Sequence, residues 1–366
     1  DTTDIRNSYV NSPGVTGVQG AYLVGGMVGR NGNWLTVQSD GSNTAAYGAA
    51  VSPSVNAKVV ATTSSGNNAF VGGVVGWSNV WNSTTTLNDT HVTGALVSGP
   101  GAYVGGLVGY AYNLNANNSY VDGTTISGTG ASNTSVYVGG MAGFAYSATL
   151  SNGHVNSPGI SATGNYVGGL IGNLDTATLS DSSYITGTVS GASYVGGVVG
   201  MTNSTAVIKG SFTVRPVTGT MDYVGGLVGK LAGTIQASDS AVGSIPANGT
   251  KYSYAAGAVT GRYDVGGLVG RADTSAFIYN AYSTGAVTAD VNYGGLVGFV
   301  TPGATLVNAH YNIDAVSITG FTPASPSTRV AVTGLITTGG LFGAQYTDWS
   351  TPALDRSEEH TSELPV

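Results

Sequence analysis

The stretch Tyr103-Val104-Gly105-Gly106-Leu107-Val108-Gly109 recurs along the chain and decides its fold. Each copy has two glycines, two apolar residues and a third glycine. Successive copies are 47, 33, 34, 29, 28, 29, 41, 28 and 45 residues apart, so a unit of 28 to 29 residues is repeated with insertions. Such a period is typical of a repeat architecture. The ten copies begin at Gly25, Gly72, Gly105, Gly139, Gly168, Gly196, Gly225, Gly266, Gly294 and Gly339.

The composition favours β-structure throughout. Glycine supplies 59 of the 366 residues and charged residues only 8%, against roughly 25% in an average soluble domain. The abundant Val, Thr, Ile and Tyr favour strands, while Gly and Asn favour tight turns. Short strands in a period of this length predict the rungs of a parallel β-solenoid.

A second phrase recurs between the glycine pairs, in most copies with Asn or Asp first and an aromatic residue third. Its aromatic slot predicts a stack of flat rings along the solenoid, and its Asn residues predict side-chain ladders or left-handed turns between strands. The Asn residues are Asn7, Asn118, Asn152, Asn280 and Asn308. The aromatic slot is assigned to Tyr9, His91, Tyr120, His154, Tyr184, Phe212, Tyr282 and His310, with Asp239 to Val242 as a further copy of the phrase.

The two residues after each glycine pair are apolar in every copy, as a core shared between rungs requires. Neighbouring residues of a regular strand point to opposite faces. The glycine pair is therefore expected at a bend or bulge, unless one residue faces a second packed layer. We predict one all-β parallel β-solenoid, right-handed, of about ten rungs, with a length on the order of 50 Å at about 4.8 Å per rung. A rung cannot bury its own apolar face, so its stability depends on its neighbours.

Three insertions lengthen the basic repeat. They are predicted near Trp34 to Gly66, Val242 to Tyr254 and Thr319 to Thr333. The last contains Pro323 and Pro326, which do not fit a central strand. Inserted loops of solenoids often carry binding surfaces.

Charge and composition exclude several classes of function. The net charge is −7 with only 11 Lys and Arg, so no basic stripe is available for nucleic acid. The sequence contains no apolar run of about 18 residues, so no membrane-spanning helix is predicted. The chain has no Cys and therefore no disulfide or thiolate metal site. No cofactor is expected.

The alternation of Val-Gly-Gly-Leu-Val-Gly with Asn-Ser-Tyr-Val resembles the GLUG repeat, over roughly Asp4 to Gly343. Such repeats occur in large bacterial surface proteins, including filamentous-haemagglutinin-like adhesins and streptococcal immunoglobulin A1 peptidases. The resemblance implies an extracellular or cell-surface location in a bacterium and repetitive β-structure. It does not imply peptidase activity, because the chain has no His-Glu-x-x-His motif.

The last residues differ in composition from the repeats. Glu358, Glu359 and Glu363 are the only glutamates, and the stretch around them resembles a translated sequencing adapter. We therefore expect residues 1–355 to form a single solenoid, cut from a longer protein whose other domains are partners, and 356–366 to be a disordered, non-native tail.

Three arrangements that resemble reactive sites are explained by the repeat. Gly225 to Lys230 is one residue short of a phosphate-binding loop and has no Ser or Thr after the Lys. His91, His154 and His310 occupy the aromatic slot, so they are interpreted as stacked rings and not as metal ligands. The Asp residues are scattered, whereas hydrolysis of a glycosidic bond requires paired acids. No catalytic residue is predicted.

One set of residues indicates binding. The residue after the third glycine is aromatic in three consecutive repeats, and further rings follow close behind it. Stacked rungs would align these rings into two files, which either cover the solenoid or bind sugars or apolar partners. The candidate aromatic strip consists of Trp77, Trp81, Tyr110, Tyr112, Phe144 and Tyr146.

The sequence thus predicts a non-catalytic stalk or adhesive segment whose partners are glycans or host-matrix proteins. A β-helical polysaccharide lyase or glycoside hydrolase is the alternative, and a groove containing several Asp with a Lys or Arg would favour it. An ice-binding solenoid is a third interpretation. It requires flat, regular Thr rows, and the uneven spacing of the repeats argues against it.

Overall fold

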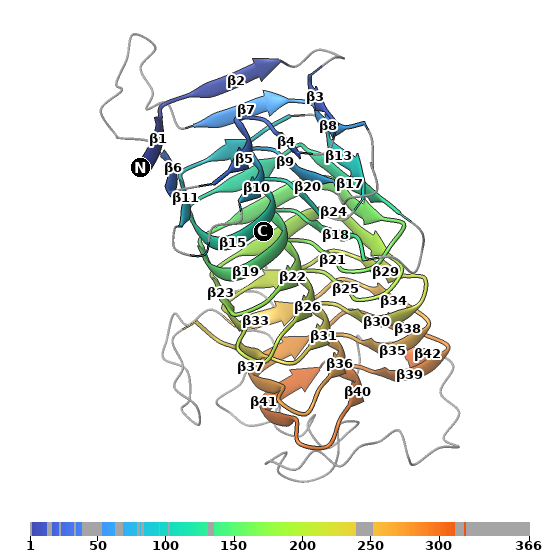
Figure 1. The fold of residues 1–366 in the computed structure, drawn as a ribbon. Helices are drawn as coiled ribbons and strands as arrows, with labels where there is room; N and C mark the ends of the chain where they lie inside the picture. Colours follow the sequence, from blue (N-terminus) through green and yellow to red (C-terminus); the bar gives the residue numbers. More distant parts are fainter. Residues whose placement is uncertain are drawn as a thin grey trace.

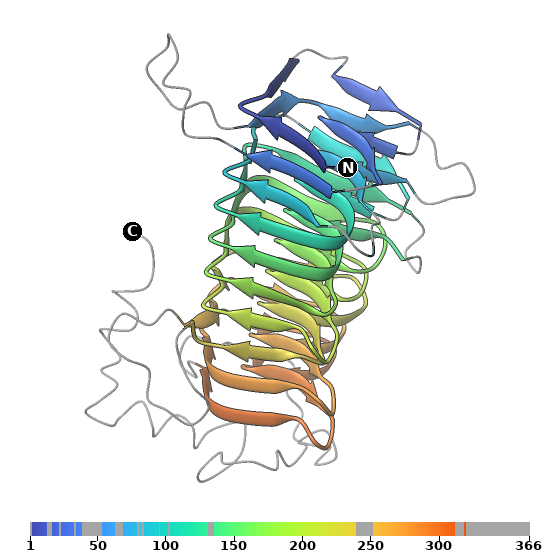
Figure 2. The same cartoon turned by 60° about the vertical axis from the view of Figure 1, so that its left-hand side comes forward.

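The computed structural model describes residues 2–12, 17–21, 23–32, 34–38, 53–62, 69–78, 81, 84–94, 96–101, 103–130, 135–238, 252–311 and 318–319. These residues form a parallel β-solenoid, as predicted, in which every pair of neighbouring strands is parallel (Figures 1 and 2). Nine rungs begin at the nine strands of a separate sheet, each of which ends at a repeat glycine. The tenth copy, at Gly339, lies outside the described residues.

Each rung has five strand positions, and the first two flank the repeat glycines. Position 1 contains β4 (Leu23–Gly25), β9 (Phe70–Gly72), β14 (Tyr103–Gly105), β18 (Tyr137–Gly139), β21 (Val167–Gly168), β25 (Val195–Gly196), β30 (Asp222–Gly225), β35 (Tyr263–Gly266) and β39 (Val291–Gly294). Position 2 contains β5 (Val28–Asn31), β10 (Val75–Ser78), β15 (Val108–Asn117), β19 (Ala142–Ser151), β22 (Ile171–Leu174), β26 (Val199–Thr202), β31 (Val228–Leu231), β36 (Val269–Ala272) and β40 (Val297–Val300).

Some strands run through two positions, so β15 and β19 also form part of position 3. The other strands of position 3 are β1 (Thr2–Arg6), β6 (Trp34–Gln38), β11 (Thr85–Asn88), β23 (Ala177–Ser180), β27 (Val207–Lys209), β32 (Thr234–Gln236), β37 (Phe277–Ser283) and β41 (Thr305–Tyr311), the last two continuing into position 4.

The remaining strands complete each rung. Position 4 contains β2 (Tyr9–Ser12), β7 (Ser54–Ala57), β12 (His91–Val92), β16 (Tyr120–Asp122), β20 (His154–Ala162), β24 (Ser183–Gly191), β28 (Phe212–Thr213) and β33 (Ser253–Ala255). Position 5 contains β3 (Val18–Gly20), β8 (Val59–Ala61), β13 (Leu96–Pro100), β17 (Thr125–Thr129), parts of β20 and β24, β29 (Val217–Gly219), β34 (Val259–Thr260), β38 (Val287–Thr288) and β42 (Ile318–Thr319).

The glycine pair forms the bend between positions 1 and 2, which confirms one of the two predicted arrangements. β14 ends at Gly105 and β15 begins at Val108, so Leu107 and Val108 both reach the core. A Cβ atom on Gly106 would lie 2.0 Å from the carbonyl oxygen of Gly140 in the next rung. The motif therefore requires glycine because backbones of successive rungs approach too closely for any side chain.

The second phrase forms a corner before position 4. Asn118 has a φ of 49°, and the left-handed conformation recurs at Asn7, Asn152 and Asn280, which confirms the predicted turns, because Asn tolerates this conformation better than most residues. The following residue, Ser119, is buried and its hydroxyl accepts a hydrogen bond from the backbone N–H of Thr90 at 3.2 Å. Asp89, Asp181 and Gly210 have the same conformation at equivalent places.

The structure corrects two alignments within the aromatic slot. His154 pairs with Ser183, so Tyr184 lies one position further along and is fully buried in the core. After Phe212 the slot continues at Tyr254, and the proposed copy from Asp239 to Val242 lies outside the described residues. Sequence spacing misplaced Tyr184 because a one-residue shift exchanges the inward and outward sides of a strand.

The predicted first insertion is shorter than expected. Between Trp34 and Gly66 the chain forms β6, β7 and β8, each of which pairs with the neighbouring rungs. The interiors of the second and third predicted insertions lie almost entirely outside the described residues. Extra residues therefore leave the register of the described strands intact.

Candidate functional site

The structure brings the candidate aromatic residues together as two files along the solenoid axis. The inner aromatic file is Trp77, Tyr110 and Phe144, which pair in register through β10, β15 and β19. The outer aromatic file consists of Trp81, Tyr112 and Tyr146. Its rings stack with centroids 4.6 Å apart between Trp81 and Tyr112 and 4.5 Å apart between Tyr112 and Tyr146.

The inner aromatic file packs against a further row of rings. The Tyr103 ring meets Tyr110 edge to face at 5.2 Å, and the Tyr137 ring meets Phe144 in the same way at 5.5 Å. Burial of its hydroxyl raises the pKa of Tyr103 to about 12. Because its rings interlock with these neighbours, the inner file serves mainly to cover the corner between positions 1 and 2.

Sequence reasoning missed this further row. It occupies the slot two residues before each glycine pair, and ring centroids of neighbouring members are 4.6 to 5.0 Å apart. The signal was present, since the slot is aromatic in six consecutive repeats. Its members are Phe70, Tyr103, Tyr137, Tyr166, Tyr194 and Tyr223.

The outer aromatic file is more accessible. Trp81 is 74% exposed, and its carbonyl oxygen accepts a hydrogen bond from the Asn113 side chain at 3.2 Å. Ring stacking within the file occupies both faces of Tyr112. An added planar ligand can therefore stack on the outer face of Trp81, whereas Tyr112 offers its ring edge and hydroxyl.

A polar groove borders the outer aromatic file. Its volume is about 400 Å³, and Asn113 and Ser147 in its lining directly follow Tyr112 and Tyr146 in the chain. All the described residues of its lining are uncharged. The lining consists of Thr84, Asn113, Leu114, Asn115, Ser147, Ala148, Thr149, Thr176, Ala177, Thr178 and Thr205.

Outward-facing residues of position 3 form the floor of this groove. Asn115, Thr149 and Thr178 line it and pair in register, and Thr86 extends their row by one rung beyond the lining. A parallel row begins at Thr84 and continues through Asn113, Ser147, Thr176 and Thr205. Regular polar rows thus exist despite the uneven repeat spacing, because the insertions lie between strands.

The ends of the groove differ in chemistry. At one end, Leu35 of β6 pairs with Thr85 of β11. Trp34 and Thr84 each come one residue earlier, so Trp34 lies beside Thr84. Trp34 is 48% exposed. At the end of the outer aromatic file, the Asp175 carboxylate accepts a hydrogen bond from the backbone N–H of Thr176 at 2.9 Å. Sequence reasoning did not select Trp34, whose place beside the groove depends on strand register.

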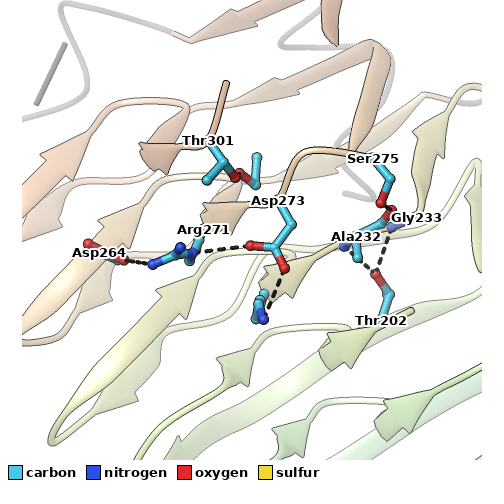
Figure 3. Close-up of polar contacts among 10 residues, drawn as sticks. Thr202, Ala232, Gly233, Asp264, Arg271, Asp273, Ser275 and Thr301 are labelled. Carbon is cyan, nitrogen blue, oxygen red and sulfur yellow. Dashed lines mark hydrogen bonds and ion pairs between the residues drawn. The ribbon is translucent and has the colours of Figure 1, made fainter. Parts of the chain in front are cut away.

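A charged cluster lies further along the solenoid (Figure 3). The Asp273 carboxylate contacts Lys230 Nζ at 2.9 Å and Arg271 Nε at 3.1 Å. Arg271 Nη1 is also 3.5 Å from Asp264, whose other oxygen accepts a hydrogen bond from Asn292 at 2.8 Å. Burial raises the pKa of Asp264, and the hydrogen bond from Asn292 opposes this shift. Lys230 lies on β31 and is ion-paired with Asp273.

Side chain to backbone hydrogen bonds surround this cluster and tie rungs together. Thr202 Oγ1 accepts from the backbone N–H of Ala232 at 3.1 Å, while Ser275 Oγ donates to the carbonyl of Ala232 at 2.7 Å (Figure 3). Thr301 Oγ1 donates to the carbonyl of Ala272 at 2.6 Å. With both carboxylates matched to cations, the cluster fits a role in joining rungs.

The His residues belong to a third stack of rings. The His91 ring lies 3.6 Å from Tyr120 and the His154 ring 4.7 Å from Tyr120, as predicted for stacked rings. Burial lowers the pKa of both imidazoles below 6.5, and Asp89 and Asp122 partly oppose this for His91 and His154 respectively. The side chain of His310, the third histidine of the predicted slot, lies outside the described part of the structure.

Acidification is expected to destabilise the solenoid through these two imidazoles. The pKa of each imidazole is lower in the folded state than in the unfolded state. Their contribution to the free energy of unfolding is therefore fully present above pH 6.5 and is lost as the pH falls from there towards the folded-state pKa values. The double variant H91Y/H154Y should lose less stability between pH 7.5 and pH 5, since Tyr120 shows that the stack accepts tyrosine. Urea denaturation at both pH values measures this; equal losses in both proteins would contradict the explanation.

Within the described residues there is no group of three or more His, Cys, Asp or Glu that could hold a metal ion. The same part of the chain contains no helix long and apolar enough to cross a membrane. Comparison with protein-family models, curated proteins and solved structures finds no match.

Proposed function

We propose that this chain is a non-catalytic segment of a bacterial surface or secreted adhesin-like protein, which binds glycans while acting as a rigid spacer. The observation that carries the proposal is the uncharged polar groove of about 400 Å³ beside the outer aromatic file. Sugar rings are recognised by hydroxyl and amide groups together with aromatic surfaces, and this groove offers both.

The rigidity of the scaffold supports binding by a preformed surface. Groove residues lie on β15, β19 and β23, whose inward neighbours Ala116, Leu150 and Leu179 pair in register and are buried. Every rung is hydrogen-bonded to the rungs beside it, so the polar rows hold their spacing before a ligand arrives. Little ordering is then required on binding, which favours affinity.

The enzymatic alternative requires carboxylates in the groove. Among the described residues the lining contains none, and Asp264 and Asp273 lie two rungs beyond that of Thr205, bound to Arg271 and Lys230. Glycoside hydrolysis requires two carboxyl groups on either side of the scissile bond. These positions favour the non-catalytic proposal.

The ice-binding interpretation has support from one observation, the regular polar rows. However, the rows line a concave groove, and the row through Thr178 continues to Val207. Ice binding requires a flat and repetitive face. An assay of ice recrystallisation with the same protein separates this interpretation from glycan binding.

Disrupting the outer aromatic file should weaken glycan binding. We expect the variant W81S/Y112S to bind at least tenfold more weakly than the parent on a glycan array and on host-matrix proteins, because the stacking surface is removed. Y9S is the matched control, since Tyr9 is 68% exposed and lies at position 4, away from the groove.

Two results would contradict the proposal. Binding that is unchanged in W81S/Y112S would place the site elsewhere. Absence of any binding by the folded parent protein would leave only the role of a spacer. Circular dichroism of each variant establishes that folding is retained.

A further inference from the structure

We infer that the polar groove takes a linear, uncharged polysaccharide lying lengthwise along the solenoid axis, with its terminal sugar at Trp34 and Trp81. This inference rests on the proposed glycan binding and specifies the class and direction of the ligand. It is carried by the charge of the lining, the spacing of its polar groups and the position of the two exposed tryptophans.

The direction of the ligand follows from the direction of the polar rows. One row contributes one side chain per rung from Thr84 to Thr205, and the rungs are about 4.8 Å apart. Its five members therefore span about 19 Å along the axis. A chain of sugars running along the axis would meet a hydroxyl or amide at regular intervals, whereas a chain across the axis would leave the groove.

The uncharged class follows from electrostatics. None of the described residues that line the groove is a Lys or Arg, so a polyanionic chain would find no counter-charge among them. The carboxylate of Asp175 occupies, on the next rung, the slot that Tyr112 and Tyr146 occupy in the outer aromatic file, and the whole chain has a net charge of −7. Both would repel uronic-acid polymers. Polymers of neutral hexoses or pentoses do not meet this repulsion.

The two exposed tryptophans define one end of the ligand. Trp34 and Trp81 are the exposed tryptophans among the described residues. Trp34 lies beside Thr84, where the polar row begins, and Trp81 stacks on Tyr112 next to Asn113, so both lie at the same end of the groove. Trp81 is also joined to Asn113 by a hydrogen bond of 3.2 Å. Indole faces are good stacking surfaces for sugar rings, whereas the remaining groove offers hydrogen bonds.

The test measures affinity by isothermal titration calorimetry on the full chain with neutral β-1,4-linked oligosaccharides of one to six sugars. Affinity should rise at least tenfold from the disaccharide to the pentasaccharide and then level off, because the row ends at Thr205. Galacturonic-acid oligomers of equal length should bind at least tenfold more weakly, and branched neutral glycans should bind no better than the disaccharide.

Two variants locate the ends of the ligand. W34A should weaken binding of oligomers of every length about tenfold, because it removes the end that each of them occupies. T205V, which keeps the shape of the side chain, should weaken only the pentasaccharide and hexasaccharide. T301V is the matched control, since Thr301 occupies a turn beyond the groove.

Each outcome is decisive. Binding that does not depend on length, equal binding of acidic oligomers, or equal effects of T205V on short and long oligomers would overturn this inference and leave the proposed glycan binding intact. If no glycan binds to the parent protein in either this titration or the array, the proposed function fails as well.

Discussion

Replacing Gly106 with alanine is expected to lower the free energy of unfolding by at least about 4 kcal/mol, the range reached by severe core substitutions. The added Cβ would lie 2.0 Å from the carbonyl oxygen of Gly140 and 2.8 Å from Val121 Cγ2. Neither contact is relieved by rotating a side chain, because the first involves backbone and the second a fully buried valine. The rungs on both sides would have to separate.

Gly159→Ala is the matched control for this substitution. Gly159 also lies in a strand, β20, but a Cβ there would meet only Thr188 O at 3.9 Å, an ordinary contact. We expect a change of less than about 1 kcal/mol, the usual difference between glycine and alanine in a strand. Urea denaturation followed by circular dichroism compares the two variants. A midpoint for G106A equal to that of the parent would show that close backbone approach does not explain the repeated glycines.

Replacing Tyr184 with alanine should have the second largest effect, a loss of about 3–5 kcal/mol, as for other buried aromatic residues. The ring is fully buried at a site where the neighbouring rungs have Val155 and Thr213. It lies against Gly169, whose ideal Cβ would be 2.8 Å from Tyr184 Cγ. The smaller neighbours cannot fill the space that its removal leaves.

Tyr184→Phe separates the contribution of the ring from that of the hydroxyl. The hydroxyl donates a hydrogen bond to the carbonyl of Thr188 at 3.2 Å, so its loss should cost about 0.5–1.5 kcal/mol. Hydrogen exchange of β24 and its neighbours gives the local stability for both variants. A cost for Y184F as large as that for Y184A would show that the hydrogen bond, and not the packing of the ring, holds this rung.

The repeat assignment could be made from the sequence because each rung satisfies the same local constraints. Gly106 meets backbone, Asn118 adopts a left-handed turn, and Ser119 joins neighbouring rungs, so these residue types recur at fixed spacing. Ring stacking in the outer aromatic file could be predicted for the same reason. Residues at equivalent positions of successive repeats lie side by side on neighbouring rungs, so their contacts follow from the spacing of the repeats.

Other features could not be predicted because strand register, and not spacing, determines them. Tyr184 was assigned to an outward stack but is buried, since the chain after Asp181 is shifted by one residue relative to the phrase. Trp34 borders the groove because β6 pairs with β11. An insertion separates these two strands in the sequence, so the repeat spacing does not predict their pairing.

The sequence by itself therefore determined the class of fold, the positions of the repeated glycines and the low content of charged residues. Tertiary structure alone decided which aromatic rings remain accessible and where the polar groove lies. The physical reason is that a side chain in a strand can point inward or outward, and a shift of one residue exchanges the two. Only the hydrogen-bonded register between rungs fixes that choice.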